Sequence, residues 1–390
     1  MIGTTTAVIS ARGAHRVARG HPWIYRSDVT VQPDGPAGVV AVDDGHGRPL
    51  GWALWSPRSE IALRLLDRDP HAEIGAAWWR AKIAAALARR ASVARDTTAY
   101  RVVHGEADGC PSLICDRYDR WLVVQLMSAG LESCRADIVS ALTGLMQPLG
   151  ILARHDAAIR RKEGLDDAVE VIAGAVPAEI EVVEHGVRYL AAPWDGQKTG
   201  AFLDQRENRV LAGELARGRA LDCFSYHGSF ALHLARRATH VTALDSSAAA
   251  LARATANAEL NDATNITWLE EDAFTYLKAA ERRRERFSIV VLDPPAFAKT
   301  RASAGSALRG YNEINLRGMR LLEPGGVLLT ASCSHHVSKA AFLDMLAGAA
   351  ADSGRRLALR RVLGQATDHP ELLAVPETGY LKGALVEALD

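Results

Sequence analysis

The second half of the chain alternates short apolar runs with longer amphipathic stretches. Two runs, Ile289–Leu292 and Val327–Thr330, are rich in β-branched residues and lack polar alternation, as is typical of strands buried on both faces of a parallel sheet. Further strands are predicted at 220–224, 240–245, 265–272, 357–364 and 381–389. Strands that alternate with helices in this way indicate an α/β doubly wound fold, here with parallel strands and a closing pair.

The first half of the chain shows two other patterns. Residues 1–72 alternate short strand patterns with turns, which predicts a small β-barrel. Residues 73–190 open with an amphipathic helix, whose Trp78 and Trp79 are expected in a core, and continue with strands around a second helix, which predicts an α+β unit. Because 390 residues exceed what one core usually supports, we expect three domains, at 1–72, 73–190 and 191–390.

Composition narrows the class of protein. The chain is 48% hydrophobic and 24% charged, and it contains no apolar run long enough to span a bilayer and no secretory signal pattern, so a cytoplasmic protein without membrane partners is expected. Five cysteines, an odd number over a long chain, fit a reducing compartment. Cys110 and Cys115 lack zinc-ligand spacing and a second pair, so no metal is expected.

The net charge of zero argues against a protein that coats nucleic acid through bulk charge. One segment, 12–27, nevertheless combines basic and aromatic groups without an acid, which suits phosphate contact with base stacking. A solvated basic edge explains the same pattern equally well. The candidate RNA-binding residues are Arg12, Arg16, Arg19, His21 and Trp23. The basic residues of 154–162 are expected to form a solvated loop.

Chemically useful side chains follow the predicted strands of the second half. In open α/β sheets, ligands bind outside the carboxyl ends of the strands. Asp293 follows one of the two buried runs and Cys333 follows the other, so a carboxylate and a thiol should face one cleft. Asp222, Asp245 and Asp272 lie at the ends of the three preceding strands.

The turn after the first of these strands favours one cofactor class over another. A Rossmann dehydrogenase needs the pattern G-x-G-x-x-G there, whereas residues 222–230 contain one glycine, Gly228. S-adenosylmethionine has no pyrophosphate, so one close-approach glycine suffices. Asp245 would then meet its ribose hydroxyls and Asp272 its adenine amine. Each acid could instead cap a helix, although capping alone explains three successive strand ends less well.

Four motifs carry a specific resemblance. They are QKTGAFLDQRENR from Gln197, LDCFSYHGSFAL from Leu221, LDPPAF from Leu292 and SCSHH from Ser332. In this order and spacing they resemble the bacterial S-adenosylmethionine-dependent 23S ribosomal RNA (cytosine-5) methyltransferases. The segment GAHRVARGHPWIYRSDV, together with residues 59–64, is similar to a PUA domain, a compact RNA-binding barrel.

The resemblance covers essentially the whole chain. It implies a class I methyltransferase (Rossmann-like) seven-stranded sheet, preceded by a small PUA-like β-barrel and a small α+β middle domain. It also implies S-adenosylmethionine as cofactor and 23S ribosomal RNA as partner, and relatives are often homodimers. The implied cofactor residues are Phe202, Asp204, Gln205, Arg206, Phe224, Ser225, Tyr226 and Gly228, beside Asp222, Asp245, Asp272, Ala273 and Asp293. His227 and Ser229 depart from the family pattern, which leaves cofactor affinity open.

Methylation of cytosine at carbon 5 explains why a thiol and a carboxylate would stand together. A thiolate that adds to carbon 6 turns carbon 5 into a nucleophile. Cys333 matches the family's nucleophile, and Asp293 could bond the cytosine amine and N3. A cationic His335 or His336 would lower the pKa of the thiol, although both can equally be solvated.

Other interpretations stay open. By itself, Cys333 fits a small buried hydrophobic residue. The Asp-Pro-Pro-Phe pattern also occurs in amino-group methyltransferases, which need no thiol. The alternatives are therefore an RNA N-methyltransferase, a transfer RNA cytosine-5 methyltransferase, and an RNA-binding assembly factor without turnover.

Overall fold

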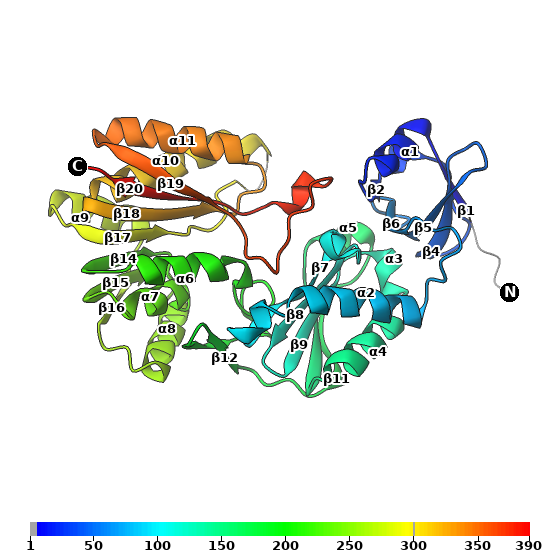
Figure 1. Ribbon diagram of the computed structural model, residues 1–390, viewed down its shortest axis with the longest axis horizontal. Helices are drawn as coiled ribbons and strands as arrows, with labels where there is room; N and C mark the ends of the chain where they lie inside the picture. Colours follow the sequence, from blue (N-terminus) through cyan, green and yellow to red (C-terminus); the bar gives the residue numbers. More distant parts are fainter. Residues whose placement is uncertain (1–5, 299–300) are drawn as a thin grey trace. The chain divides into compact units, whose positions relative to one another are not determined.

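The computed structural model describes residues 6–298 and 301–390 (Figure 1). Residues 1–5 of the expected barrel lie outside this part of the chain. The chain divides into two compact units. The first unit comprises Met1–Val182, Ala191–Leu203 and Asp368–Thr378, and the second comprises Val183–Leu190, Asp204–Thr367 and Gly379–Asp390. The expected boundaries at 72/73 and 190/191 stay predictions.

The first unit begins with a six-stranded sheet in the order β2-β6-β5-β4-β1-β3. Its apolar side chains form a core of their own that includes Ile9, Ile24, Val42 and Trp55. The strands are β1 (Thr6–Ile9), β2 (Trp23–Ile24), β3 (Val29–Val31), β4 (Gly38–Asp43), β5 (Pro49–Trp55) and β6 (Leu63–Asp67). The pattern of strands and turns missed one helix, α1 (Ala11–Ala18), which Ser10 caps by accepting a hydrogen bond from the Gly13 N–H.

A five-stranded sheet in the order β11-β10-β9-β8-β7 forms the rest of the first unit, together with three short helices and α2. Trp79 is fully buried among α2, α4 and the sheet, as expected for a core residue, while the indole N–H of Trp78 donates to Asp67 at 2.8 Å. The strands are β7 (Ala99–His104), β8 (Leu113–Tyr118), β9 (Trp121–Leu126), β10 (Gly150–His155) and β11 (Ala168–Gly174). The helices are α2 (Ala76–Arg89), α3 (Ala129–Glu132), α4 (Arg135–Met146) and α5 (Ile159–Glu163).

The prediction of a solvated basic loop at 154–162 is wrong for two of its arginines. Arg154 and Arg160 are only 5% and 4% exposed. Arg154 donates to Asp156 and to the Pro193 carbonyl, both at 2.7 Å, and Arg160 pairs with Glu132 at 3.0 Å. Pro193 and Glu132 are distant in the sequence, so the local charge pattern did not reveal them, whereas Asp156 is two residues from Arg154.

The second unit is built on a seven-stranded sheet in the order β16-β15-β14-β17-β18-β20-β19. All neighbours from β16 to β18 pair in parallel, and β20 runs antiparallel to β18 and β19, which confirms the expected parallel strands and closing pair. The strands are β14 (Arg219–Cys223), β15 (His240–Asp245), β16 (Ile266–Glu270), β17 (Phe287–Leu292), β18 (Leu322–Ser332), β19 (Leu357–Leu363) and β20 (Lys382–Ala388).

Helices cover both faces of this sheet (Figure 1). Tyr276, Tyr311 and Phe342, from three helices, pack on one face, and Ala212 and Phe230 pack on the other. The first set of helices is α9 (Ala273–Arg282), α10 (Ala304–Arg320) and α11 (Lys339–Ser353), and the second is α6 (Arg206–Leu215), α7 (Ser229–Ala235) and α8 (Ala248–Leu260). Across the described residues, no helix is long and apolar enough to cross a bilayer.

A buried ion pair ties α6 to the hairpin of β12 (Ile180–Glu184) and β13 (Val187–Ala191). Arg209 donates to both carboxylate oxygens of Glu184, at 2.7 and 2.6 Å, and His233 contacts Glu184 at 3.1 Å. Although burial opposes ionisation, Arg209 and His233 hold the pKa of Glu184 well below its usual range. The pair therefore stabilises the fold above the unfolded-state pKa of about 4.3, and this contribution is lost as the pH falls below it.

We expect Glu184→Gln to lower the free energy of unfolding by about 3–5 kcal/mol at neutral pH, because it leaves the buried Arg209 guanidinium without its counter-charge. Urea unfolding followed by circular dichroism measures the change. Asp167→Asn is the matched control, because its partner Arg161 is 63% exposed, and it should cost less than about 1 kcal/mol. Equal losses in the two variants would contradict the assigned role of Glu184.

Candidate functional site

Parallel pairing brings the ends of four strands to one edge of the second unit's sheet. Cys223, the last residue of β14, is opposite Leu244 of β15 and Leu292 of β17, and Leu292 is opposite Thr330 of β18. The residues that follow these strands therefore lie along one edge, as the sequence predicted for Asp245, Asp293 and Cys333.

The turn after β14 has an unusual backbone. Phe224, Tyr226 and Gly228 all have positive φ values, of 64°, 50° and 83°. The Ser225 N–H donates to the Leu244 carbonyl at 3.0 Å, and the Tyr226 N–H donates to Asp245 Oδ2 at 2.9 Å. Since left-handed conformations are costly for non-glycine residues, this turn is held open by its neighbours, as is common at ligand sites.

Gly228 is required in this turn because neighbouring side chains leave no room for a larger residue. A Cβ atom there would lie 2.6 Å from Cη2 of Trp268 and 3.1 Å from Cβ of Ala254. The close approach expected of this glycine is thus made to β16 and α8. Its positive φ adds a second reason against any larger residue.

Asp222, in β14, has a buried carboxyl group. It is 1% exposed, and neither of its oxygens has a hydrogen-bond partner among the described residues. Burial raises the pKa of Asp222 to about 8, and the nearby Asp293 and Asp245 carboxylates add to the rise. Asp222 therefore holds a proton at neutral pH, unless a cationic group comes close to it.

Asp245 and Asp272 already make hydrogen bonds within the protein. Asp245 accepts from the backbone N–H groups of Tyr226 and Ser247, both at 2.9 Å. Asp272 is exposed and caps α9 by accepting from the Thr275 N–H at 2.9 Å, so helix capping accounts for its position. Ala273, the first residue of α9, is buried.

Gln205 and Asp293, which the sequence placed in separate motifs, are in contact. The amide of Gln205 donates to Asp293 Oδ1 at 2.8 Å, and Asn208 in turn donates to the Gln205 amide oxygen at 2.6 Å. Asp204 accepts from the Tyr380 hydroxyl at 2.7 Å, and the buried Arg206 bonds to Glu207 at 2.9 Å. These contacts fix the segment after Leu203 next to the edge of the sheet at which the parallel strands end, which we call the carboxyl edge.

Phe202 belongs to the first unit. There the Lys198 ammonium lies 4.8 Å from the centre of its ring.

Cys333 differs from the other four cysteines, which are all buried, because it is partly exposed. The loop around it is fixed through Ser334, whose Oγ accepts from the Ala298 N–H at 3.1 Å and bonds to the Tyr311 hydroxyl at 2.9 Å. Lys382 Nζ donates to the Ser334 carbonyl at 2.6 Å. The sequence patterns did not indicate that Tyr311 and Lys382 lie near this loop. The lone lysine in the otherwise apolar stretch 381–389 could have indicated a buried polar contact at Lys382.

The candidate RNA-binding residues are mostly engaged within the first unit. Arg12 and Arg16 both pair with the buried Asp28, at 2.6 and 2.7 Å, and Arg16 also lies over the Tyr25 ring. The indole N–H of Trp23 donates to Glu106 at 2.9 Å. His21 packs edge-on against Trp23, and burial lowers its pKa. Arg19 is exposed.

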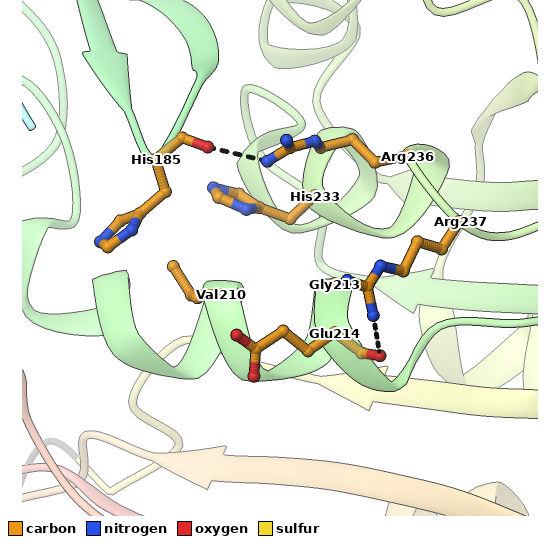
Figure 2. Close-up of a pocket in the computed structure, with 7 residues that line it drawn as sticks. All are labelled: His185, Val210, Gly213, Glu214, His233, Arg236 and Arg237. Atoms are coloured by element: carbon orange, nitrogen blue, oxygen red, sulfur yellow. Dashed lines mark hydrogen bonds between the residues drawn. The ribbon is translucent and has the colours of Figure 1, made fainter. Parts of the chain in front are cut away.

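A separate cavity of about 330 Å³ lies at the end of α7 (Figure 2). Arg236 donates to the His185 carbonyl at 2.7 Å, and Arg237 donates to the Glu214 carbonyl at 2.9 Å. The cavity is lined by His185, Val210, Gly213, Glu214, His233, Arg236 and Arg237. Because α7 starts at the turn after β14 and these arginines follow its last residue, the cavity lies away from the carboxyl edge.

We expect Gly228→Ala to destabilise the second unit by about 1–3 kcal/mol, through its positive φ and the clash with Trp268. Thermal unfolding measures the loss. Adding Trp268→Leu should recover only part of the stability, because the clash is relieved while the backbone strain remains. Full recovery of stability in the double variant would show that the positive φ of residue 228 costs no stability when an alanine adopts it.

Comparison with known proteins places this geometry in a family. Residues 111–380 match the S-adenosylmethionine-dependent methyltransferases, and residues 8–68 match a PUA-like domain. The chain is 38% identical over 387 residues to ribosomal RNA large subunit methyltransferase I from Klebsiella pneumoniae, covering 96% of each chain. It is 37% identical over 396 residues to the protein of that name from Tolumonas auensis, covering 99% and 100%.

A solved structure shares the fold. A candidate SAM-dependent methyltransferase from Streptococcus mutans superimposes with a TM-score of 0.82 at 20% identity, covering 98% of this chain and 100% of that one. Another candidate methyltransferase with the same TM-score was solved in complex with SAH. The class I methyltransferase fold with an N-terminal PUA-like domain is therefore confirmed. By its sequence and its fold, this chain belongs to the S-adenosylmethionine-dependent methyltransferase family.

Proposed function

We propose that this protein methylates carbon 5 of a cytosine in large-subunit ribosomal RNA, with Cys333 as the nucleophile. The observation that carries the proposal is the position of Cys333: it is the partly exposed cysteine, and it follows β18 next to the strand that ends before Asp293. The ribosomal RNA substrate is supported by the names of the relatives from Klebsiella pneumoniae and Tolumonas auensis.

The residues at the carboxyl edge fit S-adenosylmethionine. Asp222 is a buried carboxyl without a hydrogen-bond partner among the described residues, and a cationic ligand group nearby would restore its charge. The Asp245 carboxylate, fixed by two backbone N–H groups, keeps lone pairs that can accept from ribose hydroxyls. When bound, S-adenosylmethionine supplies an electrophilic methyl group.

The chain's own residues would activate the base. The Cys333 thiolate adds to carbon 6 of the cytosine, and the displaced electron pair makes carbon 5 nucleophilic. Gln205 fixes one oxygen of Asp293, so that the carboxyl group is positioned to accept from the exocyclic amine of the base. A hydrogen bond to N3 also forms when either N3 or the carboxyl group carries a proton. After carbon 5 carries the methyl group, loss of its proton to a base re-forms the double bond and expels the Cys333 thiolate.

The PUA-like part would contribute RNA contact. Arg12, Arg16 and Arg19 share one helix and its end, and the single negative charge of Asp28 is shared between Arg12 and Arg16. This helix therefore keeps a net positive charge that can attract RNA phosphate groups, and its ion pairs with Asp28 hold the Arg12 and Arg16 guanidinium groups in fixed orientations.

We expect Cys333→Ala to abolish formation of 5-methylcytidine while S-adenosylmethionine binding stays unchanged. The measurement is incubation with large-subunit ribosomal RNA and labelled S-adenosylmethionine, followed by nucleoside analysis of the digest. Cys134→Ala, which removes a buried thiol of the first unit, is the control and should retain activity.

Three outcomes would overturn this proposal. Label in a nitrogen-methylated nucleoside would favour an RNA N-methyltransferase, and label in transfer RNA alone would change the substrate. Unchanged 5-methylcytidine in Cys333→Ala would exclude the covalent mechanism.

We expect Asp245→Ala to raise the dissociation constant for S-adenosylmethionine at least about tenfold, which corresponds to about 1.4 kcal/mol. The change removes an acceptor for the ligand and also the anchor of the Tyr226 N–H. Isothermal titration calorimetry measures the constant. Glu259→Ala, which removes an exposed carboxylate from α8, should bind as the wild type does. An unchanged constant in Asp245→Ala would exclude Asp245 from the cofactor pocket.

A further inference from the structure

Lys382 is a buried ammonium group that the mechanism above does not use. The residue is 5% exposed and lies in β20, opposite Ser332 of β18. Its Nζ donates to two carbonyl oxygens, of Ser334 at 2.6 Å and of Tyr380 at 2.8 Å. Within the described residues, the partners of Lys382 Nζ are these two carbonyl oxygens, and no carboxylate is among them. A buried cation without a carboxylate is costly, so another negative group is expected beside it.

Cys333 is the candidate for this negative group, because it lies between Ser332, which is opposite Lys382 in the sheet, and Ser334, whose carbonyl accepts from Lys382 Nζ at 2.6 Å. Burial lowers the pKa of Lys382, and the charge of Cys333 opposes that shift. Such a coupling is reciprocal, because a thiolate that stabilises an ammonium group is stabilised by it to the same extent. One of the two hydrogen bonds of Lys382 also fixes the carbonyl of Ser334, the residue after Cys333.

Other titratable groups surround this end of the sheet. Tyr311 of α10 bonds to Ser334, and the negative charge of Cys333 helps to raise the pKa of this phenol, after burial. Asp293 follows the neighbouring strand β17, and His335 and His336 follow Cys333 in the loop. Lys382 is the buried amine among them, whereas His335 and His336 are exposed.

We propose that Lys382 is a positioning residue for Cys333, which fixes the Ser332–Ser334 turn and supplies the positive charge against which the thiolate forms. The functional meaning of this role rests on the proposed carbon-5 methylation. The pairing itself is a property of the free protein, so it can be tested without RNA or S-adenosylmethionine.

Alkylation by iodoacetamide reports on this pairing, because only the thiolate reacts and the other four cysteines are buried. The full-length protein is treated over a range of pH, and modified Cys333 is quantified by mass spectrometry, with Cys333→Ala as the blank. Lys382→Gln keeps a hydrogen-bond donor but removes the charge. In this variant we expect the midpoint pH of Cys333 alkylation to rise by one unit or more, so that alkylation near neutral pH is about tenfold slower. Lys382→Arg, which keeps the charge, should restore most of the rate.

Lys339→Met is the matched control, because it removes an exposed lysine charge at the start of α11 and should leave the profile unchanged. An unchanged midpoint in a folded Lys382→Gln variant, with native circular dichroism, would overturn the proposal. If that variant does not fold, Lys382→Met is compared with Lys382→Arg in the same assay, and equal midpoints would also overturn it.

The two proposals can fail separately. Methylation that survives Cys333→Ala would end the carbon-5 mechanism, while a midpoint that depends on Lys382 would still establish the ion pair. The converse result is 5-methylcytidine formation that requires Cys333, while the midpoint pH of alkylation is the same with and without Lys382. That result would support the proposed function and contradict the positioning role of Lys382.

Discussion

Parallel pairing of β14 to β18 is the constraint on which the rest of the second unit depends. The inner strands β14, β15, β17 and β18 are mostly buried on both faces, so helices must cover both faces of the sheet, and each helix must return the chain to the opposite edge before the next strand begins. Every loop that follows a strand therefore opens at one edge. Asp245, Asp293 and Cys333 are neighbours in space because of this rule, although 88 residues separate the first from the last in the sequence.

The electrostatics of that edge divide into two regions. Around β14 and β15, carboxyl groups gather, and burial keeps Asp222 protonated at neutral pH with a pKa of about 8. Around β18 and β20, the buried Lys382 Nζ donates to the carbonyl of Ser334, the residue after Cys333. The first region suits a cationic ligand, and the second places a positive group near the proposed nucleophile. The two regions lie on the same edge of the sheet, with β17 between them.

Sequence patterns predicted the seven strands and the order of the acidic residues along the edge, because both depend on local periodicity and on the position at which a strand ends. They did not predict α1, whose eight residues lie among short strands. They also gave no partner for a buried charge. Arg154 and Arg160 were assigned to solvent because Pro193 and Glu132, which bind them, are distant in the sequence, and the lone lysine at 382 did not show by itself what it binds. Long-range pairing leaves no trace in the residues next to a position, which is why these assignments required the structure.

The turn after β14 shows how a departure from the family pattern can be absorbed by packing. His227 departs from the family pattern that the sequence resembles, yet it is 2% exposed, and its ring stacks on Tyr189 with the ring centres 5.2 Å apart. Burial lowers the pKa of His227 to about 3, so the side chain is neutral and adds no charge to the carboxyl edge. Its carbonyl accepts from Asn257 of α8 at 2.9 Å, which holds the turn from behind. The imidazole side chain is thus accommodated by β13 and α8, and the conformation that Tyr226 and Asp245 require is kept.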